Sequence, residues 1–311
     1  METKEIRERI HAAVGQVIRG QTAVVDSLLI ASLVGGHVLL EGVPGTAKTM
    51  TARAVARALG VDFGRAQFTP DMLPSDLTGT MTLREGELVF RPGPIFTNLL
   101  LADEINRTPP KTQSALLEAM GEHQVTVDGV ARPLPSPFLV VATQNPIEYE
   151  GTYPLPEAQL DRFLMKVTVG YPEEEQEAEI LRLPRSGLAP TGLEEIEPVT
   201  SGAELLRLRE TVDGTHVEEE VADYVAALVR RTRSLPSVEL GASPRAAVHL
   251  LSAARGLARL SGRDFVTPDD ITRLAPSVLA HRILIRPEAE LERYRPDDAV
   301  SAALADVDVP R

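Results

Sequence analysis

Five short segments in the first half of the chain are mostly apolar and predict β-strands. They lie at residues 37–41, 62–69, 98–103, 138–143 and 164–169. Segments whose apolar positions recur with helical spacing, such as residues 48–59 and 110–121, separate several of these strands. Continuous apolar strands suit a parallel sheet that is covered on both faces, and their alternation with helices is typical of an α/β fold. We therefore predict an α/β core around a five-stranded parallel sheet, preceded by one or two helices within residues 5–33.

Two pairs of segments alternate polar and apolar residues and predict β-hairpins. In the first pair, residues 80–83 and 88–90 flank a charged turn that contains Gly86. In the second pair, residues 124–127 and 130–132 flank an Asp-Gly dipeptide, which favours a two-residue hairpin turn. Because both pairs interrupt the alternation of strands and helices, we interpret them as β-hairpin inserts between core elements.

The second half of the chain has a different pattern. An acidic helix is predicted over residues 173–183, and prolines and glycines are frequent in residues 184–202. From residue 203 onward the apolar periods are helical, and Ser243 and Thr267, each followed by proline, have the composition of helix starts. The predicted organisation is an α/β core in residues 1–185, a linker in residues 186–202 and an all-α lid domain in residues 203–311.

Composition and charge narrow the possible functions. The chain has no cysteine, which excludes a disulfide framework, a cysteine-ligated metal site and a thiol nucleophile. No stretch approaches the ~18 consecutive apolar residues of a membrane span, and residues 1–10 lack the apolar region of a secretory signal. The formal net charge of −13 makes a broad nucleic-acid-binding surface unexpected. We therefore expect a cytoplasmic protein with no nucleic-acid partner.

The segment after the first predicted strand has the composition of a phosphate-binding loop. Its glycines let the backbone turn so that successive N–H groups point at an anion, and the following helix directs its dipole to the same point. We expect Lys48 to reach the β- and γ-phosphates of a nucleotide and the Thr49 hydroxyl to ligate Mg²⁺. Ala47 stands in place of the usual second glycine, so it either keeps a negative φ or carries a little strain. The predicted binding residues are Gly42, Val43, Pro44, Gly45, Thr46, Ala47, Lys48 and Thr49.

Two acidic residues end the third predicted strand, in the pattern of a Walker B motif. Asp103 is expected to hold Mg²⁺, directly or through water. Glu104 is expected to polarise the attacking water as a general base. Asn145 follows the next apolar strand along the chain and is placed to orient that water beside the γ-phosphate.

In this order, the strand, phosphate-binding loop, Walker B motif and polar residue resemble an AAA+ ATPase. Several longer pieces are similar to the MoxR family of these ATPases, and the similarity runs from about residue 10 to residue 290. The pieces are GPIF (93–96), LADEINR (101–107), PKTQSALLEAM (110–120), ATQNP (142–146), PEAQLDRF (156–163), GRDFVTPDDI (262–271) and LAHR (279–282).

The resemblance implies roles for further residues. Arg162 resembles the arginine finger, which one subunit supplies to its neighbour's γ-phosphate, and Arg245 resembles the lid residue called sensor 2. Residues 17–21, with Ile18, resemble the segment that packs on adenine, while Arg107 is an open candidate for the subunit interface. The implied cofactors are ATP and Mg²⁺. The implied assembly is a homo-oligomeric ring, expected to be a hexamer, that remodels client proteins or inserts metals or cofactors, often with a von Willebrand factor A domain partner.

Three other functions remain open from the sequence. One is the ATPase subunit of a metal chelatase, which shares both hairpin inserts. Another is a nucleic-acid motor or loader, although the first hairpin carries Arg84 and Arg91 against Glu85 and Glu87, a balance that is poor for tracking phosphates. The third is a switch that binds nucleotide and barely hydrolyses it.

Overall fold

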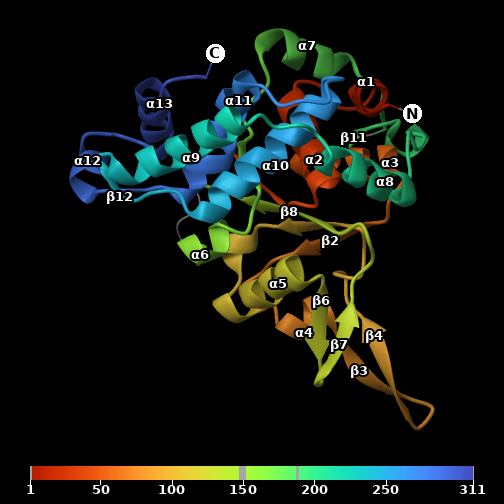
Figure 1. Ribbon diagram of the computed structural model, residues 1–311. Helices are drawn as coiled ribbons and strands as arrows, with labels where there is room; N and C mark the ends of the chain where they lie inside the picture. The colour runs from red at the N-terminus through yellow and green to blue at the C-terminus, as the bar shows by residue number, and fades with distance from the viewer. Residues whose placement is uncertain (1, 147–151, 187–188, 311) are drawn as a thin grey trace.

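The five predicted strands form one parallel sheet in the computed structural model, which describes residues 2–146, 152–186 and 189–310 (Figure 1). The strands are β1 (Val38–Glu41), β2 (Phe63–Gln67), β5 (Leu99–Asp103), β8 (Leu139–Gln144) and β9 (Met165–Thr168). Their spatial order is β2-β5-β8-β1-β9, so that β8 lies between β5 and β1. Because parallel strands end at the same edge of a sheet, this order brings the ends of β1, β5 and β8 together.

Helices cover both faces of the sheet, as the apolar strands require. Leu99 and Leu101 face one apolar core, which they share with α1 (Thr3–Gly15), α2 (Thr22–Val34) and α3 (Lys48–Ala58). Leu100 and Ala102 face the opposite core, which contains α5 and Leu77 of α4. The bounds of these two helices are Pro74–Thr78 for α4 and Pro110–Glu122 for α5.

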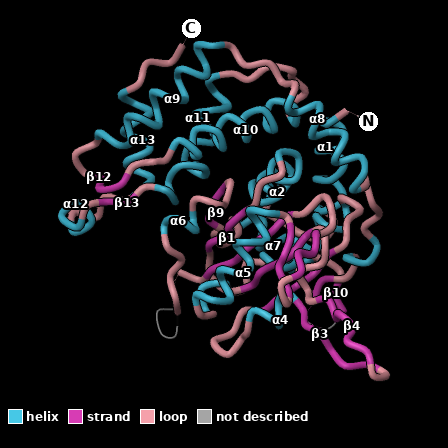
Figure 2. Tube along the Cα trace, turned by 60° about the horizontal axis from the view of Figure 1, so that its bottom comes forward, coloured by secondary structure: helices cyan, strands magenta, loops and turns pink. Residues whose placement is uncertain are grey.

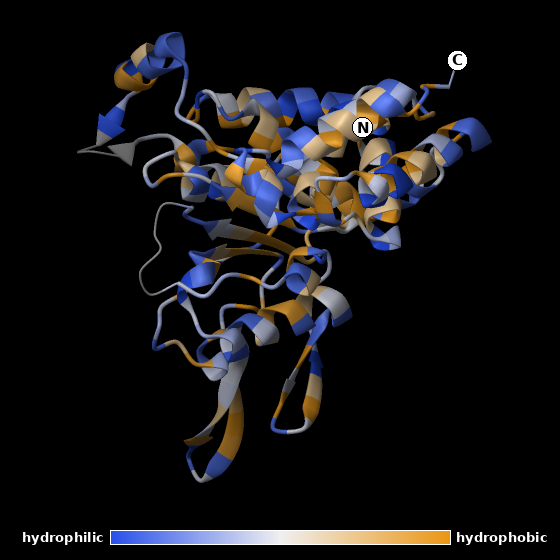
Figure 3. Ribbon diagram, turned by 90° about the vertical axis from the view of Figure 1, so that its left-hand side faces the viewer, coloured by the Kyte–Doolittle hydropathy of each residue, from blue (hydrophilic) through white to orange (hydrophobic). Residues whose placement is uncertain are grey.

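Both predicted hairpins are present and project from the side of the sheet where α5 lies (Figures 1 and 3). The Arg132 guanidinium of the second hairpin lies 3.8 Å from the centre of the Phe90 ring in the first, so the two hairpins contact each other. The strands are β3 (Gly79–Arg84) paired with β4 (Glu87–Pro92), and β6 (Gln124–Val127) paired with β7 (Val130–Pro133).

A layer of helices follows the core and lies against α1 and α2 (Figure 2). Gly256 of α10 allows a close approach to α2, since an added Cβ would lie 3.2 Å from Val34 and 3.3 Å from Ile30. The predicted helix starts are confirmed, because the Ser243 hydroxyl accepts a hydrogen bond from the Ala246 N–H and Thr267 forms a capping box. The helices are α8 (Gly202–Asp213), α9 (Glu219–Ser234), α10 (Pro244–Leu260), α11 (Pro268–Leu279), α12 (Pro287–Leu291) and α13 (Pro296–Asp306).

The helical region also holds a short antiparallel pair, β12 (Val238–Leu240) with β13 (Leu284–Ile285), which the sequence pattern did not predict. Two or three residues are too few to show an alternation of polar and apolar positions. In the described part of the chain, no helix is long and apolar enough to cross a membrane.

The segment predicted as a linker, residues 186–202, packs on the core where it is described. The Val199 N–H donates to the Ala58 carbonyl at 2.7 Å, and Arg57 Nε donates to the Ile196 carbonyl at 2.9 Å. Residues 187–188 of this segment lie outside the described residues, and the three domain boundaries stay predictions. The remaining short elements are α6 (Glu157–Leu160), α7 (Glu174–Arg182), β10 (Arg185–Ser186), β11 (Ala189–Pro190) and the 3₁₀ turns Ile105–Arg107, Leu193–Glu195 and Ala280–Arg282.

Candidate nucleotide-binding and catalytic site

The loop between β1 and α3 forms one wall of a cavity of about 390 Å³. Gly42 starts the loop against the Val169 carbonyl, where an added Cβ would lie only 2.3 Å from the oxygen. Gly45 has φ +85° and no atom within 4 Å of an added Cβ, so its backbone faces open space. The Thr46 hydroxyl donates to the Val43 carbonyl at 3.0 Å and tightens the turn. The residues that line the cavity are Pro44, Gly45, Thr46, Ala47, Lys48, Thr49, Met50, Asp103, Glu104, Thr143, Gln144 and Asn145.

The sequence allowed two backbone conformations at Ala47, and the structure shows the strained one. Its φ is +61°, in the left-handed region, where a Cβ costs roughly 1–2 kcal/mol. The N–H and the hydroxyl of Thr51 both donate to the Ala47 carbonyl, at 2.9 and 3.0 Å. These two bonds join the Ala47 carbonyl to the first turn of α3.

Lys48 lies at the base of the loop and bridges its backbone. Its ammonium donates to the carbonyls of Gly42 at 2.6 Å and Val43 at 2.8 Å. Partial burial lowers the pKa of Lys48, while the nearby charges of Asp103 and Glu104 act in the opposite direction. Lys48 therefore lines the same cavity as the acidic pair, and its contact with phosphates stays a prediction.

Asp103, the last residue of β5, is held by neighbours from both adjacent strands. Its Oδ1 accepts from the Thr143 hydroxyl of β8 at 2.6 Å, and its Oδ2 accepts from Arg65 Nη2 of β2 at 2.7 Å. The Thr49 hydroxyl lies 3.4 Å from the same Oδ2. Hydroxyl and carboxylate oxygens side by side are the ligands that Mg²⁺ prefers, so Thr49 and Asp103 fit a magnesium site.

Glu104 follows directly, with φ +58°, so the chain turns sharply after β5. Its N–H donates to the Thr143 hydroxyl at 2.9 Å, and its Oε2 accepts from Gln67 Nε2 at 2.7 Å. Arg107 Nε lies 3.1 Å from the same oxygen, so Arg107 pairs within its own chain. Glu104 reaches the cavity together with Asn145, which is buried at the end of β8.

A second, mostly apolar cavity of about 110 Å³ lies on the other side of the loop. It shares Gly45, Thr46, Ala47 and Met50 with the first cavity. An apolar slot that continues from the loop suits a flat base. Ile18 lines this slot, and its contact with adenine stays a prediction. The other lining residues are Val17, Ile18, Arg19, Gln21, Pro172, Ile180 and Leu183.

Comparisons with known proteins cover both the core and the lid. The model of the ATPase family associated with various cellular activities (AAA) matches residues 37–165, and the AAA lid domain model matches residues 230–303. Chaperone MoxR1 of Mycobacterium tuberculosis (strain ATCC 25618 / H37Rv) is 45% identical over 98% of this chain and 82% of its own length. The chain belongs to the MoxR family of AAA ATPases.

Two further similarities support this assignment to the MoxR family. Protein YeaC of Bacillus subtilis (strain 168) is 48% identical over 96% of this chain and 92% of its own length. A crystal structure from Cytophaga hutchinsonii ATCC 33406 superposes with a TM-score of 0.91 at 40% identity, covering 99% of this chain and 97% of that one. The similarity therefore includes the core and the lid together.

The two arginines that the MoxR resemblance singled out lie outside the cavity lining given above. Arg162 follows α6, and its Nη1 donates to the Leu117 carbonyl of α5 at 2.9 Å. Arg245, in the first turn of α10, is half-exposed and lies 3.7 Å from Asp161. An arginine that acts on a neighbouring subunit is expected to lie away from its own cavity, but the roles of Arg162 and Arg245 stay predictions.

Three residues that contact the acidic pair of this MoxR-family site were missed by sequence reasoning: Thr143, Arg65 and Gln67. Thr143 ends a predicted strand and lies in the ATQNP piece without an assigned role, and the other two lie in a strand with no recognised motif. The sequence feature that could have identified them is their polarity, since each is a polar side chain near the carboxyl end of its strand. Only the spatial order, which places β2 and β8 on either side of β5, shows that they meet Asp103 and Glu104.

Proposed function

We propose that this chain is a Mg²⁺-dependent ATPase that uses ATP hydrolysis to remodel partner proteins or to insert metals or cofactors into them. The observation that carries the proposal is the convergence of Lys48, Thr49, Asp103, Glu104 and Asn145 on one cavity at the edge of the sheet. The fit of Thr49 and Asp103 to a hard cation supports the metal requirement.

Each residue has a task in hydrolysis. The N–H groups of residues 44–48 and the Lys48 ammonium bind the phosphates. Glu104 accepts a proton from the water that attacks the γ-phosphorus, while Asn145 orients that water and the bond to the ADP oxygen breaks. Mg²⁺, when bound at Thr49 and Asp103, neutralises charge on the phosphates. Arg162 of the next subunit stabilises the charge that spreads over the transferred group, and Arg245 contacts the phosphates from the lid.

A finger supplied by a neighbour requires an oligomer, since one subunit then has an incomplete site. We propose a homo-oligomeric ring, a hexamer, in which hydrolysis changes the positions of the lid and the hairpins. The chaperone name of the MoxR1 relative supports a protein client. A protein with a von Willebrand factor A domain is the proposed partner, and the cytoplasm is the proposed location.

The test uses Glu104→Gln with Glu292→Gln, an exposed acid of the lid, as the matched control. Glu104→Gln is expected to bind a fluorescent ATP analogue with wild-type affinity and to hydrolyse ATP about 100-fold or more slowly, because the general base is lost. Glu292→Gln is expected to keep both properties.

The same Glu104→Gln protein with ATP then tests the assembly and its output. Light scattering is expected to give a hexameric mass, and affinity capture is expected to retain client proteins in the presence of ATP but not ADP. Undiminished hydrolysis by Glu104→Gln would contradict the catalytic proposal. A monomer at every nucleotide concentration would contradict the ring.

A further inference from the structure

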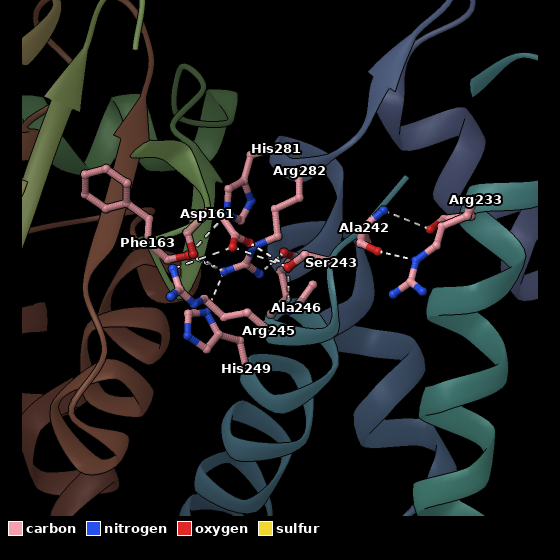
Figure 4. A network of polar contacts seen from close by, with 12 residues as sticks. Asp161, Phe163, Arg233, Ala242, Ser243, Arg245, Ala246, His249, His281 and Arg282 are labelled. Atoms are coloured by element: carbon pink, nitrogen blue, oxygen red, sulfur yellow. Dashed lines mark hydrogen bonds and ion pairs between the residues drawn. The ribbon is translucent and has the colours of Figure 1, made fainter. Parts of the chain in front are cut away.

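The turn formed by residues 161–163 joins the core to the lid, with Arg162 at its centre. It follows α6 and leads into β9 of the sheet. Figure 4 shows that the Asp161 carboxylate and the Phe163 carbonyl, on either side of Arg162, face a polar network of lid residues, while the Phe163 ring points away from it. The residue proposed as the finger is therefore flanked on both sides by contacts to its own lid.

The Asp161 carboxylate contacts three residues of the lid (Figure 4). The Ser243 hydroxyl, which also caps α10, lies 3.2 Å from Oδ1 and 3.3 Å from Oδ2. Arg282 Nε forms an ion pair with Oδ1 at 2.9 Å, and Arg245 Nη1 lies 3.7 Å from Oδ2. A single carboxylate thus joins the start of α10 to the turn at residues 280–282.

The Phe163 carbonyl is a second attachment point for the same part of the lid. It accepts from Arg282 Nη2 at 2.5 Å and from His281 Nε2 at 3.2 Å. The Phe163 ring is fully buried in the core beneath the sheet, so this carbonyl has little freedom to move. Residues of the lid therefore form polar contacts with the turn on both sides of Arg162.

Asp161 also balances a buried charge. Arg282 is only 6% exposed, and its Nη2 contacts His249 Nδ1 at 2.5 Å. Burial lowers the pKa of Arg282 to about 10, while Asp161 raises it, so the guanidinium keeps its charge at neutral pH. Burial, followed by the charge of Arg282, lowers the pKa of His249 to about 4, so this imidazole is neutral and accepts the bond. Asp161 is thus the anion that faces the buried Arg282 cation.

We propose that Asp161 is a positioning residue, which transmits the position of a subunit's own lid to Arg162 and so controls hydrolysis in the neighbouring subunit. This inference rests on the proposed role of Arg162 as a finger in trans. The physical basis is geometric: Arg162 is anchored to the core through Leu117, and its neighbours are anchored to the lid. A lid that rotates carries Ser243 and Arg282 with it, and Asp161 passes that displacement to the adjacent residue. A misplacement of about 1 Å at a reacting centre is enough to slow a reaction on the order of 100-fold.

The test combines Asp161→Asn with complementation by mixed subunits. Asp161→Asn alone is expected to lower kcat at least tenfold, with the Kd for a fluorescent ATP analogue within twofold of wild type. Mixed with Glu104→Gln, it is expected to regain activity, because the Glu104→Gln subunits supply intact fingers to intact Asp161→Asn sites. Mixed with Arg162→Ala, it is expected to regain none, since both partners then lack a working finger.

Two controls separate positioning from simple loss of stability. Asp306→Asn breaks the exposed Arg231–Asp306 pair, 2.7 Å long, between α9 and α13, and is expected to keep wild-type kcat. The double variant Asp161→Asn/Arg282→Gln removes both charges of this ion pair. It is expected to regain thermal stability relative to Asp161→Asn while its kcat stays low.

The outcomes that overturn the inference differ from those that overturn the proposed function. Rescue of Asp161→Asn by Arg162→Ala, but not by Glu104→Gln, would show that Asp161 acts in its own site. Recovery of kcat together with stability in the double variant would show a purely structural role. A wild-type kcat in Arg162→Ala would show that Arg162 is not an arginine finger, and it would overturn the inference that rests on this role. An inactive Arg162→Ala beside a fully active Asp161→Asn would overturn the inference alone.

Discussion

The Thr143 hydroxyl offers a sharp test of how the acidic pair is held. This side chain is 1% exposed, donates to Asp103 Oδ1 at 2.6 Å and accepts from the Glu104 N–H at 2.9 Å. Thr143→Val keeps the shape but removes both hydrogen bonds. The bond to the Asp103 carboxylate contributes about 1.5–3 kcal/mol, and an unsatisfied N–H costs about 1–3 kcal/mol. Because parts of these terms overlap, we expect Thr143→Val to lower the free energy of unfolding by about 2–4 kcal/mol.

Thr143→Ser is the matched control, since it keeps the hydroxyl and removes one methyl group. Thr143→Ser is expected to lower the free energy of unfolding by about 1 kcal/mol, which is the contribution of one buried methyl group. Urea denaturation monitored by circular dichroism measures both costs. Titration of ATPase activity with MgCl₂ tests the orientation of Asp103. Thr143→Val is expected to need at least about tenfold more Mg²⁺ for half-maximal rate, which corresponds to about 1.4 kcal/mol. Equal losses of stability in the two variants would refute this reasoning, as would an unchanged Mg²⁺ requirement in Thr143→Val.

Two further predictions concern the binding loop and the buried His37. Lys48→Ala removes the ammonium that bridges the Gly42 and Val43 carbonyls, and it is expected to weaken binding of a fluorescent ADP analogue about 100-fold or more; wild-type affinity would contradict the phosphate role. Burial lowers the pKa of His37 to about 4 from its ordinary 6.5, so only the unfolded chain takes up this proton as the pH falls below 6.5. Its contribution to stability is complete above pH 6.5 and is expected to fall by about 2 kcal/mol by pH 5. Denaturation at pH 7 and pH 5 measures the fall, and His37→Gln is expected to lose less between these pH values than wild type.

The sequence by itself determined the local parts of this protein. The apolar runs predicted all five core strands, and the Asp-Gly dipeptide predicted a hairpin turn at Asp128, which has φ +51°. Ser243 and Thr267 marked the starts of α10 and α11, since a cap depends on residues only three positions away. The binding loop was recognisable for the same reason, because neighbouring residues supply its N–H groups, its lysine and its hydroxyl.

Only the tertiary structure decided which distant residues meet. The order of strands placed Thr143 on Asp103, 40 positions away, because β8 lies beside β5. Packing of the lid brought Arg282 to Asp161 across 121 positions, and no local pattern around either residue indicated this pair. Contacts between distant segments depend on how whole layers pack, which a local pattern of polar and apolar residues does not contain.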